Sequence, residues 1–272
     1  MLRYIKNNSF YILTLLLLIW CIGPLVWLLI ISFAHNDLSS TSFVLMNFDI
    51  LNYLKLFEER DFFFIIRNSF IVALITTILS LSIATLTAYA LTRKNVRFGK
   101  LFLFIFLSVS MFPSIATLSP LYMIFRTLGL RDSILSLIIP YTVFCLPISI
   151  WILAGYFKQI PKELEESAKI DGCSDFKIFW NIFLPLLSPG LATAAILIFV
   201  YCWNEFIFAI SFTATKMSRT IPPDISLFPT GSGYVMGDLA AASIITSIPL
   251  VLIVLFFQRK IISGLTSGAV KE

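Results

Sequence analysis

Glu205 is an acidic residue deep within an apolar stretch, residues 190–212, and it has polar and aromatic neighbours. If that stretch is one continuous helix, Tyr201, Asn204, Glu205 and Phe208 follow the spacing i, i+3, i+4, i+7 and share a face. Aromatic rings stack on sugars, and amide and carboxylate groups form hydrogen bonds with them. An acid inside a membrane span is a candidate functional residue by default. The pattern is compatible with a pathway or gate, with a direct sugar ligand, or with packing through an interhelical hydrogen bond.

The composition of the chain is that of a protein embedded in a membrane. Hydrophobic residues make up 58% of the 272 residues and charged residues 13%, whereas soluble domains have roughly 25% charged residues. Several apolar runs reach the roughly 20 residues that a helix needs to cross a bilayer: 10–33, 65–91, 101–125, 134–157, 190–212 and 239–257. Their continuous apolar character predicts helices rather than barrel strands. We therefore expect an all-α, polytopic membrane protein with six transmembrane helices.

Basic residues gather at alternate connections between these runs. They lie near the N-terminus, between the second and third runs, between the fourth and fifth runs, and after the sixth run: Arg3, Lys6, Arg93, Lys94, Arg97, Lys100, Lys158, Lys162, Lys169, Lys177, Arg259, Lys260 and Lys271. Because Lys and Arg concentrate in cytoplasmic loops, we expect both termini and the loop 158–189 in the cytoplasm. This distribution explains the net charge of +5 without a nucleic-acid partner.

The loop 158–189 is a polar stretch between two apolar runs, and its first part predicts a short helix. Pro161 suits the first turn of a helix, and residues 162–170 are mostly good helix formers. Acidic residues lie near the start, where the helix dipole favours them. One predicted face is narrow and made mostly of small side chains, which permits close approach by another surface: Leu164, Ser167, Ala168 and Asp171.

Gly172 predicts the end of this first helix, because glycine adopts the left-handed conformation without a Cβ clash. Ser174 is a predicted cap for a second helix. That helix would carry an apolar stripe of Phe176, Phe179, Trp180 and Phe183. By itself, the loop is compatible with an ordinary amphipathic connector or with a rigid lever that passes motion between a soluble partner and the spans.

The spacing within this loop resembles a motif of a known membrane-protein family. Glu166-Ser167-Ala168 is followed by Gly172 and then by Ile182, Leu184 and Pro185. These are the offsets of the glutamate-alanine-alanine loop in the permeases of binding-protein-dependent ABC importers. Ser167 stands where that motif has its first alanine, which exchanges one small residue for another. The resemblance extends from about Asn68 to the C-terminus.

Further stretches are similar to the carbohydrate-importer permeases of the maltose-G and trehalose type. These are Trp203-Asn204-Glu205-Phe206, residues 211–216 and the tail residues 264–271. The resemblance implies a type I ABC importer permease (MetI-like) fold. It also implies three regions: a first helix with an external segment over 1–64, a five-helix core over 65–260 and a cytoplasmic tail over 261–272.

The resemblance further implies how the chain works. A separate ATPase subunit would grip the loop 158–189 through Glu165, Glu166, Ser167, Ala168, Asp171, Gly172, Ile182, Leu184 and Pro185. The expected partners are a second homologous permease subunit, two ATPase subunits that bind ATP and Mg²⁺, an extracytoplasmic sugar-binding protein and membrane lipid. The loop before the last span would reach toward the binding protein. We expect a disaccharide such as trehalose or maltose as the cargo, and a bacterial-type inner membrane as the location.

The sequence lacks the motifs of an enzyme. It has no G-x-x-x-x-G-K-[ST] phosphate-binding loop, so we expect ATP hydrolysis in another chain and no cofactor in this one. No Ser/His/Asp set or zinc motif lies within the apolar runs, and the cysteines lack disulfide or metal-ligand spacing. The alternatives are a secondary transporter that couples Glu205 to protons, and a membrane-embedded enzyme. The scarcity of charges within the apolar runs and the missing catalytic set disfavour them.

The external connections carry weaker signals. Asp132 or Ser133 is a candidate cap for the fourth apolar run. The loop 213–238 is rich in Pro, Gly, Ser and Thr, so we expect no regular structure there. Such a loop is compatible with a plain connector or with a surface that touches a partner.

Overall fold

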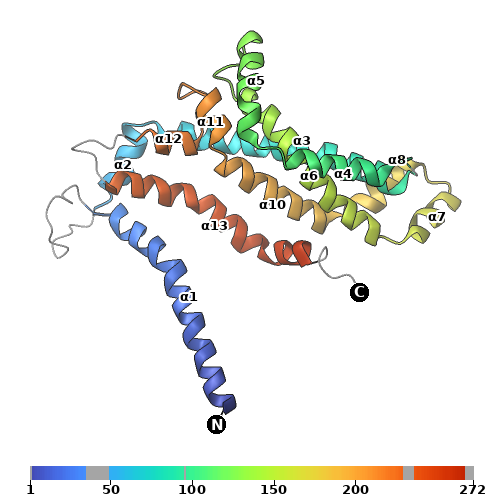
Figure 1. The fold of residues 1–272 in the computed structure, drawn as a ribbon, viewed down its shortest axis with the longest axis horizontal. Coiled ribbons are helices and arrows are strands. Elements are labelled where there is room, and N and C mark those ends of the chain that lie inside the picture. The colour runs from blue at the N-terminus through green and yellow to red at the C-terminus, as the bar shows by residue number, and fades with distance from the viewer. Residues whose placement is uncertain (1, 35–48, 95, 229–235, 267–272) are drawn as a thin grey trace. The chain divides into compact units, whose positions relative to one another are not determined.

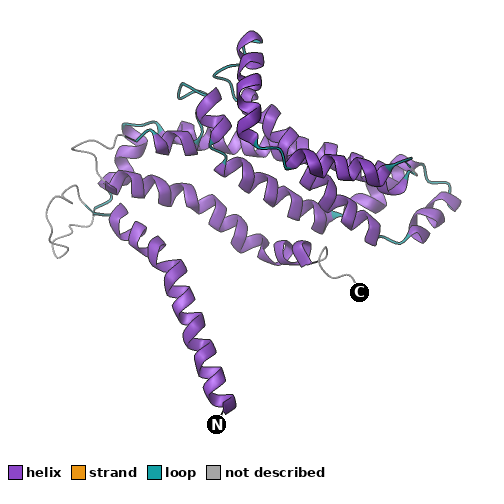
Figure 2. Ribbon diagram, in the orientation of Figure 1, coloured by secondary structure: helices purple, strands orange, loops and turns teal. Residues whose placement is uncertain are grey.

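The computed structural model describes residues 2–34, 49–94, 96–228 and 236–266. Within these ranges the regular elements are helices (Figures 1 and 2), which confirms the predicted all-α class. The chain forms two compact units. The smaller comprises residues 1–63 with 225–248, and the larger comprises residues 64–224 with 249–272.

Within the described residues, four continuous helices are long and apolar enough to cross a membrane. They are residues 11–32 of α1 (Leu2–Ser32), α3 (Phe62–Arg93), α6 (Leu135–Gln159) and residues 236–258 of α13 (Met236–Thr266). A fifth candidate is a bent pair of helices, residues 175–186 and α10 (Ser188–Asn204), which are inclined by 72°. Four of the six predicted runs therefore coincide with continuous helices, and the third and fifth runs differ.

The third apolar run, 101–125, is not the continuous helix that we predicted. It is divided between α4 (Gly99–Ser110) and α5 (Ser114–Thr127), and Figure 1 shows α5 turned away from the direction of α4. Pro113 explains the break, because it has no N–H for the helix ladder and disfavours helical backbone at Phe112. With its 12 residues, α4 has a length of about 18 Å, which is shorter than the roughly 30 Å hydrocarbon core.

The fifth apolar run, 190–212, is also interrupted. α10 ends at Asn204, and α11 (Ile207–Phe212) begins after Glu205, whose backbone is extended (φ −70°, ψ 126°). The prediction that Tyr201, Asn204, Glu205 and Phe208 share one face of a continuous helix is therefore wrong, because the helix ends between them.

The core of the larger unit lies where α6 packs against α3, α4, α10 and part of the loop 158–189. α6 and α10 approach each other closely at Gly190. A Cβ at this position would lie 2.6 Å from the ring of Tyr156, so the packing requires glycine. The buried side chains of this core include Ala84, Ala88, Ile150, Leu153, Phe157, Phe179 and Phe183.

In the smaller unit, Asn52 attaches α2 (Leu51–Glu58) to the end of α1. Its side-chain amide donates to the carbonyl oxygens of Ser32 (2.9 Å) and Ala34 (3.0 Å). Gly237, at the start of α13, comes so close that a Cβ would lie 2.4 Å from the Asn52 amide nitrogen. A buried asparagine thus satisfies the free carbonyls at the C-terminal end of α1.

The loop 213–238 and the tail 261–272 contain more helix than we predicted. The loop 213–238 includes a helix, α12 (Ile221–Ser226), so the expectation of no regular structure is wrong there, while residues 229–235 lie outside the described part. α13 continues as a helix to Thr266 and thus enters the predicted tail 261–272. The rest of that tail lies outside the described residues.

Candidate functional site

The first helix of the loop 158–189 is α7 (Lys162–Ile170), as the sequence predicted. Glu165 and Ala168 are buried, and the Glu165 carboxylate pairs with Lys169 Nζ at 2.7 Å. These two residues therefore face the rest of the chain. The predicted small-residue face is correspondingly divided, since Ala168 is buried whereas Leu164, Ser167 and Asp171 are exposed; Glu166 is exposed as well.

The turn after α7 has the hydrogen-bond pattern of a Schellman motif. The Gly172 N–H donates to the Lys169 carbonyl (3.0 Å), and the Cys173 N–H donates to the Ala168 carbonyl (2.9 Å). Gly172 has φ +78°, in the left-handed region that a Cβ disfavours. Ser174 then caps the next helix with its hydroxyl oxygen. The predicted glycine turn and serine cap are both present.

The second half of the loop is less regular than the single helix that we predicted. α8 (Asp175–Ile178) continues into a π-helical segment, Phe179–Phe183, and then into α9 (Leu184–Leu186). π-Helical turns are rare and are frequent at functional sites. Of the remaining predicted loop residues, Ile182 and Leu184 are partly buried and Pro185 is exposed.

The predicted aromatic stripe is divided between two environments. Phe179 and Phe183 are buried in the core, whereas Phe176 and Trp180 are 72% and 50% exposed. The stripe is divided because the π-helical segment changes the angular spacing of the side chains. Ile170, at the end of α7, is 87% exposed. The loop thus carries exposed apolar side chains beside polar ones.

Glu205 is buried at the break between α10 and α11. Its Oε1 accepts a hydrogen bond from the Phe208 N–H (3.0 Å), and its Oε2 accepts from the Ala209 N–H (3.2 Å). The Tyr141 hydroxyl of α6 also donates to Oε2, at 2.5 Å. The carboxylate therefore satisfies N–H groups that would otherwise be free at the start of α11.

Tyr141, rather than a helical face, brings most of the predicted residues together. The rings of Tyr201 and Phe208 lie 6.1 Å and 6.4 Å from the Tyr141 ring. Asn204 does not join them, because it is exposed and its amide donates to the Val200 carbonyl within its own helix (2.8 Å). The structure thus places Tyr201, Glu205 and Phe208 around one tyrosine and leaves Asn204 outside.

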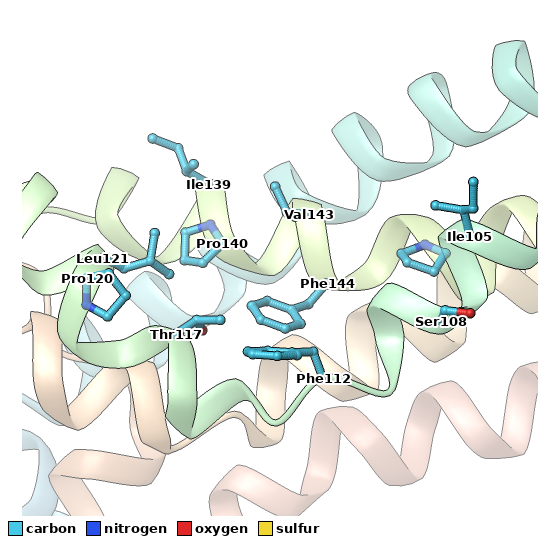
Figure 3. Close-up of a pocket in the computed structure, with 11 residues that line it drawn as sticks. Ile105, Ser108, Phe112, Thr117, Pro120, Leu121, Ile139, Pro140, Val143 and Phe144 are labelled. Atoms are coloured by element: carbon cyan, nitrogen blue, oxygen red, sulfur yellow. The ribbon is translucent and has the colours of Figure 1, made fainter. Parts of the chain in front are cut away.

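An apolar pocket of about 640 Å³ lies between α4, α5 and α6, beside this group (Figure 3). Phe112, at the break between α4 and α5, and Phe144 of α6 lie toward each other in the pocket. The Phe144 ring also packs against Phe208, with ring centroids 5.4 Å apart. The lining is mostly apolar and therefore has few groups that could hydrogen-bond a sugar: Ile105, Ser108, Phe112, Thr117, Pro120, Leu121, Ile139, Pro140, Val143, Phe144 and Pro147.

Comparison with known proteins identifies the family. Inner membrane components of binding-protein-dependent transport systems match residues 80–266 of this chain. This range includes the loop 158–189, Glu205 and Tyr141. The chain belongs to this family of permeases.

The permease is 39% identical over 262 residues to the trehalose/maltose transport system permease protein MalG of Thermococcus litoralis, and the match covers 94% of each chain. It is 41% identical over 222 residues to the trehalose transport system permease protein SugB of Mycobacterium tuberculosis, with 81% of each chain covered. These relatives confirm the resemblance to carbohydrate ABC importer permeases.

A solved structure supports the fold. One chain of a bacterial ABC transporter involved in the import of the acidic polysaccharide alginate superimposes with a TM-score of 0.80, at 21% identity. The match covers 94% of the permease and 96% of that chain. Together with the family match, it confirms the predicted ABC importer permease fold.

In the permease, Asp132 ties the turn between α5 and α6 to the segment after α11. Its Oδ1 accepts hydrogen bonds from the N–H groups of Ala214 (2.8 Å) and Thr215 (2.9 Å) and from the Ser218 hydroxyl. Its own N–H donates to the Phe212 carbonyl (2.9 Å). The role of cap for α6 that we considered for Asp132 is therefore wrong, because the carboxylate is turned toward another loop.

Burial raises the pKa of the Asp132 carboxyl, but the hydrogen bonds from Ser218, Thr215 and Ala214 outweigh this effect and hold the pKa well below its ordinary value.

Ser133, the other candidate cap for α6, accepts a hydrogen bond from the Leu135 N–H at 3.3 Å. The short turn thus has two functions, since one residue supports α6 and the other fixes the segment after α11.

Asn68 of α3 holds the same segment from another direction. Its amide nitrogen lies 3.0, 3.1 and 3.0 Å from the carbonyl oxygens of Lys216, Met217 and Arg219. Met217 is nevertheless 84% exposed. The segment therefore presents its tip outward on a backbone that side chains from two other elements fix.

Several of these residues were not found from the sequence. Tyr141 and Asn68 lie within apolar runs and belong to no motif. Their roles become visible only in the tertiary contacts. Arg93 and Lys94 were interpreted only as charges that orient the chain, although both side chains contact the loop 158–189 or the helix before it. The only sequence feature that pointed to this role was the position of these basic residues directly at the end of an apolar run.

Proposed function

We propose that this chain is the permease subunit of an ATP-driven, binding-protein-dependent sugar importer, and that its cargo is a disaccharide such as trehalose or maltose. The unit formed by α7, the Gly172 turn, α8 and the π-helical segment carries this proposal. Its exposed apolar side chains, Ile170, Phe176 and Trp180, indicate a protein partner, because such groups on an otherwise polar loop mark interaction sites. The choice of cargo rests on relatives named for trehalose and maltose transport.

The partner that grips this loop is a separate ATPase subunit, which binds ATP and Mg²⁺ and does the nucleotide chemistry. Two such subunits, a second homologous permease and an extracytoplasmic sugar-binding protein complete the transporter. Among the loop residues predicted from the sequence, those that meet the ATPase directly are the exposed ones, Glu166, Ser167, Asp171, Gly172 and Pro185. The buried or partly buried ones, Glu165, Ala168, Ile182 and Leu184, hold the loop in shape.

The permease lies in a bacterial-type inner membrane, with both termini and the loop 158–189 in the cytoplasm. The basic residues that accompany the cytoplasmic connections support this orientation. The regions of the chain are the first helix with its external segment over 1–64, the five-helix core over 65–260 and the tail over 261–272.

The group around Tyr141 belongs to the translocation pathway or its gate rather than to a sugar-binding site. Both carboxylate oxygens of Glu205 accept hydrogen bonds from within the chain, so few acceptor positions are left for a sugar. The interruption between α10 and α11, which Glu205 stabilises, is a point where the helix can bend.

Uptake by the reconstituted transporter tests the proposed function. The complete complex is placed in proteoliposomes with its binding protein and radiolabelled trehalose or maltose. Vanadate should abolish uptake, whereas a protonophore should leave it unchanged, because ATP hydrolysis supplies the energy. Uptake that survives vanadate but fails with the protonophore would instead identify a secondary transporter.

A pair of variants on α7 tests the docking role of the loop. Glu166→Lys reverses a charge on the exposed face and should reduce uptake by about tenfold or more. Glu163→Lys makes the same change one turn earlier on the exposed surface of the helix and should reduce uptake by no more than about twofold. Equal uptake in the two variants would argue against docking through this face. A thermal-shift screen of sugars on the cognate binding protein identifies the cargo.

A further inference from the structure

The end of α3 contacts the start and the second half of the loop 158–189, together with the end of the helix before it. Tyr89, Arg93 and Lys94 lie within the last turns of α3 or directly after it. Together these side chains contact the π-helical segment, the end of α6 and the start of α8. α3 precedes the loop by more than 60 residues, so this is a tertiary connection that does not follow from the order of the chain.

Arg93 binds the C-terminal end of α6. One guanidinium nitrogen, Nη2, donates to the carbonyl oxygens of Phe157 and Ile160, at the end of a helix where carbonyl groups lack the usual intrahelical partners. A cation in this position also interacts favourably with the negative end of the helix dipole. The same guanidinium lies 5.1 Å from the ring of Phe183. Arg93 therefore joins the helix before the loop to the π-helical segment near its end.

Tyr89 fills the space between the two halves of this arrangement. Its ring centroid lies 5.8 Å from that of Phe157 on α6, and 5.3 Å and 5.6 Å from those of Phe179 and Phe183 in the π-helical segment. Aromatic pairs at these distances contribute roughly 0.5–1.5 kcal/mol each beyond their burial. The four rings make a continuous apolar contact from α3 through α6 to the loop.

Lys94 adds an exposed ion pair with Asp175, the first residue of α8. Their mutual hydrogen bond raises the pKa of the Lys94 ammonium and lowers that of the Asp175 carboxyl. Exposed ion pairs of this kind contribute little to stability. The ion pair is informative about geometry, because it marks a point where the end of α3 meets the start of α8.

We propose that Arg93 and Tyr89 are positioning residues that make α3 move as one body with the loop 158–189. In this arrangement, work that the ATPase does on the loop reaches α3 directly, in addition to α6 and α10, which continue from the loop along the chain. α3 runs from Phe62 to Arg93, so the motion would be passed along the whole of that helix, including Asn68. The inference deepens the proposed function and depends on it.

The first test measures coupling in the complete reconstituted transporter. Arg93→Gln removes the charge that bridges α6 and the π-helical segment, and it should lower the ratio of sugar transported to ATP hydrolysed by about tenfold. Arg93→Lys keeps the charge without the planar donors and should give an intermediate ratio. Arg97→Gln is the matched control, since it removes an equal charge from an exposed position in the same connection and should stay within about twofold of the wild type.

Co-purification of the ATPase separates this inference from the proposed function. Suppose that Arg93→Gln retains the ATPase and transports as much sugar per ATP hydrolysed as Arg97→Gln does. The positioning role is then wrong, and the proposed function stands. If no ATPase co-purifies with the wild-type permease, the proposed function itself is contradicted. Where Arg93→Gln fails to assemble, the second test decides.

The second test fixes α3 to the loop covalently. Lys94→Cys and Asp175→Cys are combined in a variant whose four native cysteines, Cys21, Cys145, Cys173 and Cys202, are replaced by serine, and they are joined by a short bis-maleimide that replaces the ion pair. If α3 and the loop move as one body, the cross-linked transporter should retain at least about half of the uptake that it had before cross-linking. Loss of uptake on cross-linking, with no loss in either single-cysteine variant treated in the same way, would overturn the inference.

Discussion

At the scale of single residues, Glu205 shows how a buried acid can have a structural role in a membrane helix. A charge inside the bilayer is costly unless hydrogen bonds compensate it. Here the carboxylate receives donors from the backbone of α11 and from Tyr141. The acid and the helix break stabilise each other, because the break frees the N–H groups that the acid binds. Glu205 thus connects α10, α11 and α6 at one point.

Removal of the Glu205 carboxylate should therefore reduce transport more than assembly. Glu205→Ala leaves the Tyr141 hydroxyl and two backbone N–H groups without their acceptor, at a cost of roughly 1–3 kcal/mol for each buried group. We expect uptake to fall by about tenfold or more, with the thermal midpoint of the purified complex lowered but the complex intact. Glu205→Gln retains one acceptor oxygen and should be intermediate.

Asn204→Ala is the control for this prediction. Asn204 is the neighbouring polar residue, but it is exposed and bonds only to its own helix through the Val200 carbonyl. Its replacement should change uptake by no more than about twofold. Unchanged uptake kinetics in Glu205→Ala would reduce Glu205 to a packing residue. If replacing Asn204 reduces uptake more than replacing Glu205 does, the functional residue is the exposed Asn204 and not the buried acid.

Asp132 makes a prediction about pH. Its folded pKa lies below the ordinary value, so its contribution to stability is present above about pH 4, the ordinary Asp pKa, and is lost as the pH falls through the folded pKa. Between roughly pH 5 and 8 this contribution is constant. Asp132→Asn should therefore accelerate trypsin cleavage after Lys216 by about tenfold at every pH in that range. An acceleration that appears only at high pH would contradict this assignment, and Asp49→Asn controls for a general loss of negative charge.

At the scale of elements, the sequence predicted which segments are helices better than where they break. Run length and apolar character were sufficient for α1, α3, α6 and α13, since the bilayer sets the length of a span. Prolines did not identify the breaks, because Pro24, Pro140, Pro147 and Pro249 lie inside continuous helices. Pro113 stands at a break, and neighbouring helices decide whether the backbone groups freed by a proline are satisfied.

The break at Glu205 could not be predicted, because its stabilising partner Tyr141 lies on another helix. Local chemistry, in contrast, was sufficient at the turn after α7. Gly172 and Ser174 have roles that depend on backbone conformation and nearby N–H groups alone. The sequence therefore located the loop and its turn, while the contacts that hold the loop to α3 required the tertiary structure.

A graded series at Gly172 tests the turn as an element. A Cβ at this position would meet no atom within 4 Å, so the left-handed backbone alone determines the cost of substitution. Gly172→Asn should be tolerated, and Gly172→Ala should cost roughly 1–2 kcal/mol. Gly172→Pro cannot adopt the observed φ and loses the hydrogen bond to Lys169. It should leave the protein inserted but uncouple ATP hydrolysis from uptake.

Gly155→Ala is the matched control for this series. Gly155 lies within α6 with no atom within 4 Å of an added Cβ, and alanine favours a helix. Its uptake per ATP hydrolysed should equal that of the wild type. The same ratio in Gly172→Pro would show that the conformation of the turn does not matter for coupling.

At the scale of the whole molecule, α6 sets the distance between the two candidate contact surfaces of the larger unit. It begins beside Asp132, which binds the segment around Met217, and it ends at the loop 158–189. Its 25 residues correspond to about 38 Å of helix, which exceeds the roughly 30 Å hydrocarbon core. Figure 1 shows α7 and α11 far apart within this unit. The two surfaces should therefore lie on opposite sides of the membrane.

Thiol labelling tests this arrangement directly. Cys173 lies in the turn between α7 and α8 and is partly exposed, so a membrane-impermeant maleimide should modify it only from the cytoplasmic side, in a variant without the other cysteines. Met217→Cys, with Cys173 also replaced, should be modified only from the external side, because Met217 is 84% exposed. Bound ATPase should protect Cys173 and leave position 217 reactive, since only the loop 158–189 is covered. Modification of both positions from one side would contradict the arrangement in which α6 crosses the membrane between the two surfaces.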